Sequence, residues 1–204
     1  RLRFVFVGDS ACGKSSMLLR FYRDTFTQAW LPTQYELFNK TVDVDGQDFD
    51  LELWDTSGNI ELNQLSLLSY LAWDGVFLCF SVNSDKKFTN AQTKWINSIR
   101  MHCPGAPVFL LGLKKDTRVG SGMWAPLFPT WETRIGASEG SMAAHAMGTV
   151  KYMECSAKTG EGVDRIFEEG VRIVQTLRAG DDATIREKPQ KMSLGKLFCF
   201  QAEQ

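Results

Sequence analysis

The sequence predicts an α/β fold built on a doubly wound, mostly parallel six-stranded sheet, with one antiparallel edge strand and helices on both faces. Two nearly unbroken apolar runs, at residues 76–82 and Val108–Leu113, are typical of parallel strands that are covered on both sides. Apolar residues at helical spacing lie between and after these runs, whereas residues 41–53 alternate with the period of a strand. This order of elements places ligands at the carboxyl ends of the parallel strands.

The first elements are a strand, a glycine-rich loop and a helix. Leu2–Val7 is a short apolar strand, and residues 15–22 form a helix with its apolar side chains toward the core. Residues 41–53 form a β-hairpin around Asp45-Gly46, a dipeptide that favours a tight turn. The apolar face of the hairpin consists of Val42, Val44, Phe49, Leu51 and Leu53.

The later elements complete the sheet and its helical layers. Residues 152–155 form a last short strand, whereas residues 119–131 contain glycines, prolines and tryptophans that favour an irregular surface excursion. Two crossover helices are indicated by apolar residues at helical spacing. These residues are Phe88, Ala91, Trp95, Ile96 and Ile99 in the first helix, and Val163, Ile166, Phe167, Val171, Val174 and Leu177 in the second.

Composition is typical of one globular domain with a tail. The chain has 204 residues, of which 44% are hydrophobic and 23% charged, and we expect a domain at residues 1–178 and a flexible tail at 179–204. A net charge of -1 argues against nucleic acid as a partner. The five cysteines are not at metal-ligand spacing, which favours a reduced, cytoplasmic chain. As a separate expectation, the protein is a monomer. We expect neither a membrane span nor a leader, although a start at Arg1 leaves an upstream segment open.

Residues 8–15 carry the strongest functional motif. They match the P-loop pattern of glycine, four residues and Gly-Lys-Ser, between a predicted strand and a predicted helix. Gly8 and Gly13 allow successive N–H groups to point at one anion, Lys14 would lie along the β- and γ-phosphates, and the Ser15 hydroxyl would bind magnesium. The predicted phosphate contacts also include Asp9, Ser10, Ala11, Cys12 and Ser16. The alternative is a strand-to-helix turn in which the glycines and lysine are incidental.

The base is expected to be guanine. Asp116, in Leu113-Lys114-Lys115-Asp116, follows an apolar strand, and its carboxylate can accept hydrogen bonds from N1–H and the exocyclic amine of guanine, a pair of donors that adenine lacks. With this motif the chain resembles the small GTPases, whose pattern is Asn/Thr-Lys-x-Asp. Lys114 and Asp116 match the pattern, but Leu113 replaces its polar residue, which would loosen the nucleotide.

The resemblance implies further site residues. Ser156, Ala157 and Lys158 are similar to the last guanine motif, and Phe26 matches an aromatic that packs against the base. Asp55 and Gly58, in Asp55-Thr56-Ser57-Gly58, are similar to the Asp-x-x-Gly motif, in which the aspartate reaches magnesium and the glycine N–H meets the γ-phosphate. Thr33 is similar to the threonine that completes the magnesium shell in the triphosphate state. The implied metal ligands are therefore Ser15, Thr33 and Asp55.

Within the small GTPases, residues 2–178 resemble the Rho family. The more specific marks include Leu68-Ser69-Tyr70, Lys94-Trp95, His102-Cys103-Pro104 and the run from Tyr152 to Ala157, and residues 119–131 suit the Rho insert. The resemblance implies a GTP/GDP-dependent switch in cytoskeletal or polarity signalling. It also implies effector binding through residues 33–38 and 59–70, with exchange factors and activating proteins as further partners.

Two positions depart from the family at the hydrolysis machinery. The residues expected to act in hydrolysis are Lys14, Thr33, Gly58 and Asn59. Ser10 stands where most relatives have glycine, and Asn59 stands where they have the glutamine that orients water. As in the Rnd-like members of the family, we expect weak GTPase activity, the alternative being drift at tolerant positions. A second interpretation is a GTP-locked or nucleotide-poor binding scaffold.

The end of the sequence differs from the usual prenylation signal. Cys199 lies two positions too early for a cysteine four residues from the terminus. Residues 188–200 contain three lysines, no acid and several apolar residues, which could attract an anionic membrane at about 1 kcal/mol per lysine. We therefore expect weak peripheral contact with the plasma membrane, with a solvated, disordered tail as the alternative.

Overall fold

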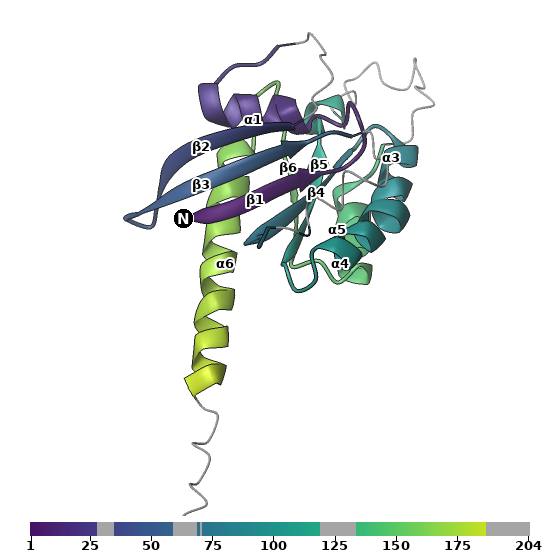
Figure 1. Cartoon of the computed structure of the whole chain (residues 1–204). Coiled ribbons are helices and arrows are strands. Elements are labelled where there is room, and N and C mark those ends of the chain that lie inside the picture. The colour runs from purple at the N-terminus through teal and green to yellow at the C-terminus, as the bar shows by residue number, and fades with distance from the viewer. Residues whose placement is uncertain (28–34, 59–68, 70, 119–133, 187–204) are drawn as a thin grey trace, which may run out of the picture.

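The computed structural model describes residues 1–27, 35–58, 69, 71–118 and 134–186, and Figure 1 shows their arrangement. The strands are β1 (Leu2–Val7), β2 (Tyr35–Val44), β3 (Gln47–Thr56), β4 (Gly75–Ser81), β5 (Val108–Leu113) and β6 (Lys151–Glu154). The helices are α1 (Lys14–Arg23), α3 (Asp85–Asn90), the π-helical turn η2 (Ala91–Trp95), α4 (Ile96–His102), the 3-10 turn η3 (Lys115–Arg118), α5 (Ala137–Ala146) and α6 (Val163–Arg186).

The sheet confirms the predicted fold class. Its six strands have the order β2-β3-β1-β4-β5-β6. All neighbours pair in parallel except β2 and β3, which are antiparallel. The chain order reverses between β1 and β4, so the carboxyl ends of these two strands flank a topological switch point, where open α/β sheets bind ligands.

Helices cover both faces of the sheet, and each face has its own hydrophobic cluster (Figure 1). Phe4 and Phe6 of β1 contribute to the cluster under α1 and α6, whereas Val5 and Val7 contribute to the cluster under α3, η2, α4 and α5. This alternation follows the period of two along a strand. It explains why β1 is apolar at nearly every position, as the sequence analysis assumed for the central strands.

Several elements differ from the predicted bounds. The hairpin is longer than expected, with β2 beginning at Tyr35 and β3 ending at Thr56, and its turn holds Asp45 and Gly46 at φ of 56° and 81°. The single helix expected around residues 88–99 is divided by η2 into α3 and α4. Helix α5 was not predicted, and residues 119–131 lie outside the described residues.

The last helix extends past the predicted domain boundary. α6 runs to Arg186, so residues 179–186, which the sequence analysis assigned to a flexible tail, continue the helix. Figure 1 shows the end of α6 projecting beyond the sheet. The division into a domain and a tail stays a prediction. Among the described helices, none has the length and hydropathy needed to cross a bilayer.

Candidate nucleotide-binding site

The loop between β1 and α1 requires glycine at both ends of the motif. Gly8 has a φ of 144°, and a Cβ atom there would lie 2.0 Å from the carbonyl oxygen of Cys79 in β4. Gly13, at the N-cap of α1, has a φ of 112°. L side chains rarely adopt such conformations, so the two glycines let the loop press against the end of the sheet and enter α1 directly. A helix N-terminus behind a tight backbone loop is suited to an anion.

Lys14 folds back over this loop. Its ammonium group donates to the carbonyl oxygens of Gly8, at 2.8 Å, and Asp9, at 3.2 Å. Only 5% of the residue's surface is exposed. Carbonyl oxygens carry no full negative charge, so an anion in the loop would meet a cation that is already in place.

The side chain of Asp9 ties the loop to the helical layer. Its carboxylate accepts hydrogen bonds from the amide of Asn90, at 2.7 Å, and from the indole of Trp95, at 2.8 Å. Its negative charge is therefore engaged away from the anion site. Only the backbone of Asp9 is left for the phosphate contact that the sequence analysis predicted.

Asp55, near the end of β3, is fully buried. Both carboxylate oxygens are shielded from solvent, and the side-chain donor that acts on them is the Ser15 hydroxyl. Burial raises the pKa of Asp55 to about 6, although the neighbouring Ser15 hydroxyl and the Lys14 ammonium oppose this shift. A buried carboxylate with a hydroxyl beside it offers two oxygen ligands, and oxygen ligands are what Mg²⁺ prefers. Ser15 and Asp55 thus lie together, as a magnesium site would require.

Gly58 brings the next loop against the phosphate loop. A Cβ atom at Gly58 would lie 2.1 Å from the backbone nitrogen of Ser10, so only glycine permits this approach. The two loops that should surround a γ-phosphate are therefore in contact through Gly58 and Ser10. Thr33 and Asn59, predicted to act at the same place, lie outside the described residues.

Lys114 connects the predicted base site to the phosphate loop. Its ammonium group donates to the carbonyl oxygen of Ala11 at 2.8 Å. Its backbone is held at a φ of 61°, while the backbone N–H and the hydroxyl of Thr117 donate to its carbonyl at 2.9 and 2.8 Å. Lys114 thus spans from β5 to the P-loop and aligns the segment that carries Asp116.

Asp116 and the last guanine motif lie together. The hydroxyl of the fully buried Ser156 donates to Oδ1 of Asp116 at 2.6 Å, and the N–H of Lys115 donates to the carbonyl of Cys155 at 3.0 Å. These bonds leave Oδ2 of Asp116 and the remaining lone pairs of Oδ1 as acceptors for a base. Ala157 packs against the core cluster, and Lys158 is exposed.

Two further positions modify the base site. Phe26 exposes 38% of its surface, so its ring is accessible to a planar ligand such as a base. Leu113 stands where the guanine motif of the small GTPases has a polar residue, and it is buried. Its Cβ lies 3.7 Å from the position that a Cβ atom on Gly13 would occupy, so Leu113 packs against the phosphate loop. Leu113 therefore replaces a polar brace of the phosphate loop by an apolar contact.

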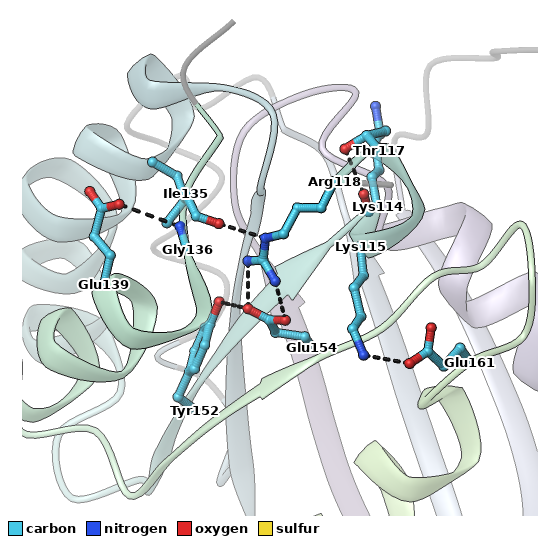
Figure 2. A network of polar contacts seen from close by, with 10 residues as sticks. All are labelled: Lys114, Lys115, Thr117, Arg118, Ile135, Gly136, Glu139, Tyr152, Glu154 and Glu161. Carbon is cyan, nitrogen blue, oxygen red and sulfur yellow. Dashed lines mark hydrogen bonds and ion pairs between the residues drawn. The ribbon is translucent and has the colours of Figure 1, made fainter. Parts of the chain in front are cut away.

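A clamp of Arg118, Glu154 and Tyr152 joins the two base-site segments (Figure 2). The guanidinium of Arg118 donates to both oxygens of Glu154, at 2.5 and 2.6 Å, and its Nε donates to the carbonyl of Ile135 at 2.7 Å. The Tyr152 hydroxyl donates to the same carboxylate at 2.5 Å. Burial alone would raise the pKa of Glu154, but these hydrogen bonds outweigh it and the pKa is lowered.

Sequence reasoning missed this clamp. Arg118 lies two residues after Asp116, and Glu154 lies two residues before Ser156. Their adjacency to both guanine motifs was the available signal, because a charged residue next to a binding segment often positions it.

Comparisons with known proteins show which family the chain is similar to. Residues 3–176 match the family model described as Ras family. The chain is 38% identical over 172 residues to the GTP-binding protein RHO1 of Candida albicans, which covers 84% of this chain and 87% of that protein. It is 39% identical over 172 residues to the GTP-binding protein rho5 of Schizosaccharomyces pombe, with 84% and 86% covered.

Proposed function

This chain belongs to the Rho family of small GTPases, within the Ras family, and we propose that it is a switch that binds GTP and GDP with magnesium and hydrolyses GTP slowly. The observation that supports this most strongly is the meeting of three groups at one edge of the sheet. The buried Lys14 lies over the phosphate loop, the buried carboxylate of Asp55 lies beside Ser15, and Asp116 is oriented by Ser156. An ammonium, a metal carboxylate and a base acceptor in this order fit a guanosine phosphate.

Each part of the site has a distinct task in this proposal. The backbone of residues 8–15 and the Lys14 ammonium bind the phosphates, while Ser15, Asp55 and Thr33 hold magnesium. The ion would neutralise charge on the phosphate oxygens. Asp116, Ala157, Lys158 and Phe26 orient the base, with Ser156 fixing the carboxylate of Asp116.

Nucleotide specificity is tested by Asp116→Asn. The wild-type carboxylate accepts two donors from guanine, whereas an asparagine retains one oxygen acceptor for Ser156 and offers an amide donor instead. We expect calorimetry with magnesium to give tight binding of GTP and none of ATP for the parent protein. Asp116→Asn should lose GTP and gain xanthosine triphosphate, whose base presents a carbonyl in place of the amine. Equal affinity of the parent for GTP and ATP would reject the proposal.

Slow hydrolysis rests on Ser10 and Asn59. The backbone of Ser10 lies at the contact between the phosphate loop and Gly58. A serine side chain there, in place of glycine, would add bulk near the path of water to the γ-phosphate. Asn59 is one methylene shorter than glutamine. A positioned glutamine and an activating arginine are together worth several powers of ten in rate. Loss of either contribution therefore gives a long-lived triphosphate state.

Single-turnover hydrolysis tests this part of the proposal. We expect Ser10→Gly combined with Asn59→Gln to hydrolyse GTP at least about tenfold faster than the parent protein, with each single variant in between. An ordinary Rho protein measured beside them gives the reference rate. A parent rate equal to that reference would reject slow hydrolysis while leaving nucleotide binding intact.

A binding scaffold without useful turnover is the second candidate, and Leu113 favours it. An apolar contact to Gly13 replaces a polar brace, so the nucleotide would be held more loosely. Chromatography of the nucleotide released by denaturing the purified protein separates the candidates. GDP indicates turnover, GTP indicates a locked state, and no nucleotide indicates a scaffold.

Effectors would dock at the edge strand, and the tail would contact membranes. Tyr35 and Leu37 lie two residues apart on β2 and expose 41% and 43% of their surfaces, so they give one face of the edge strand an apolar contact area that suits an interface. Exchange factors and activating proteins are the further partners that this proposal includes.

Co-sedimentation with anionic liposomes, with and without residues 187–204, tests the tail. Equal binding of the two chains would reject its membrane role and the proposed peripheral location at the cytoplasmic face.

A further inference from the structure

A second lysine that the nucleotide motifs do not include lies at the phosphate loop. The ammonium group of Lys87, in α3, donates to the carbonyl oxygen of Ala11 at 3.0 Å. The same oxygen accepts from Lys114 at 2.8 Å. Two ammonium groups thus share one carbonyl of the loop, next to the carbonyls of Gly8 and Asp9 that hold Lys14.

The positive charges at this loop exceed the negative charges available to them. Within the described part of the chain, no carboxylate forms an ion pair with Lys14, Lys87 or Lys114. Asp55 acts electrostatically on Lys14 and Asp9 acts on Lys87, but the oxygens of Asp9 also accept hydrogen bonds from Asn90 and Trp95. Burial and then the charge of Lys114 lower the pKa of Lys87. Like charges on one carbonyl are costly unless an anion joins them.

The position of Lys87 is fixed by its helix. Lys87 and Asn90 are three residues apart and therefore share a face of α3, from which one contacts Ala11 and the other contacts Asp9. The backbone N–H of Lys87 also donates to the N-cap side chain of Ser84 at 3.4 Å. The helix thus presents the ammonium to the loop as part of a two-point contact, whereas a free surface lysine would be solvated.

We propose that Lys87 is a nucleotide-binding residue whose ammonium group supplies charge to the phosphate chain from the α3 side. This inference rests on the proposed function. The carbonyl of Ala11 holds the ammonium in place, and the anion in the loop relieves its repulsion from Lys114. The added attraction offsets the polar brace that Leu113 removes, and it lies in a helix outside the recognised motifs.

The test compares two neighbouring lysines. Lys86 is exposed and adjacent in the same helix, so Lys86→Gln changes the net charge as Lys87→Gln does without touching the loop. Affinities and dissociation rates for fluorescent GDP and GTP are measured at low and high salt, on full-length protein with magnesium. We expect Lys87→Gln to weaken binding about tenfold at low salt, as loss of a charge-assisted hydrogen bond would, and Lys86→Gln to change it less than about twofold.

Salt separates a charge effect from a structural one. If Lys87 acts by charge, the gap between Lys87→Gln and the parent narrows at high salt, and Lys87→Arg retains most of the affinity. If the two glutamine variants bind alike, or the loss is independent of salt, Lys87 only braces the loop and the inference is overturned. A parent protein that binds no guanine nucleotide would overturn the proposed function and this inference with it.

Discussion

In the proposed function, a single side chain, Asp55, would link the stability of the protein to magnesium. Its carboxylate is buried, and this burial raises its pKa to about 6 from the usual 3.8. The cost of burying the charge is therefore absent below pH 3.8, grows as pH rises, and is complete above pH 6. A cation that meets this carboxylate removes the cost, so at neutral pH the metal-free protein is the less stable form.

Asp55→Asn should stabilise the metal-free protein. At pH 7, we expect the free energy of unfolding in chelator to rise by about 2–3 kcal/mol, because no charge is buried, and the gain should disappear near pH 4. Urea denaturation at both values measures this. Asp48→Asn, which changes an exposed carboxylate in the same strand, should change it by less than about 0.5 kcal/mol. A gain that is the same at both pH values would contradict the assignment.

Magnesium affinity should also depend on pH. A cation in the proposed site would require the ionised form of Asp55, so we expect the apparent magnesium affinity of the nucleotide complex to fall as pH drops through 6, by up to about tenfold per unit. Titration of magnesium between pH 7.5 and about 5, followed by nucleotide release, measures this. Asp55→Asn should show weak affinity with little dependence on pH.

At the scale of elements, the clamp of Arg118 and Glu154 should hold the two base-site segments together. Removing one partner leaves a partly buried charge unpaired, so Arg118→Gln should cost about 1–3 kcal/mol of stability and release guanine nucleotide faster. Arg172→Gln breaks an ion pair with Asp45 at the hairpin turn, distant from the base site, and is the control. Thermal unfolding and nucleotide dissociation rates report both effects. Equal release from the two variants would show that the clamp does not position the base site.

The contact between α5 and β6 depends on a missing side chain. A Cβ atom at Gly140 would lie 2.2 Å from the ring of Tyr152, whereas one at Gly180 in α6 would meet nothing within 4 Å. Gly140→Ala should therefore destabilise the protein by about 1–3 kcal/mol, while Gly180→Ala should raise stability by up to about 1 kcal/mol through helix propensity. Chemical denaturation of both variants checks this, and a neutral Gly140→Ala would mean that Tyr152 can move aside.

The elements that sequence reasoning missed have weak or distant signals. Residues 137–146 are rich in alanine, glycine and serine, so α5 buries only Gly140, Ala143 and Ala144 and shows little apolar periodicity. The clamp joins positions 118 and 154, which no local pattern connects. In contrast, the P-loop pattern lies within eight consecutive residues and could be recognised locally, and the fold holds its two glycines at positive φ with Lys14 over the loop backbone.

For the whole molecule, nucleotide binding should raise the stability of one cooperative unit. The site draws on residues that follow β1, β5 and β6 and on the end of β3, so a ligand that bridges them stabilises the sheet as a whole. At about a thousand times its dissociation constant, a ligand adds roughly 4 kcal/mol. We expect GTP with magnesium to raise the melting temperature in proportion to the logarithm of its concentration, and ATP to leave it unchanged. A shift of equal size with both nucleotides would contradict guanine recognition.

The projecting end of α6 sets the distance between the globular body and Arg186, where the helix ends. A helix advances about 1.5 Å per residue, so residues 179–186 add a stiff spacer of about 12 Å. The same residues in an extended, pliable form could cover more than twice that span in any direction. A proline introduced in this stretch would thus alter both the distance and the direction of the helix end, and leave the candidate nucleotide site unchanged.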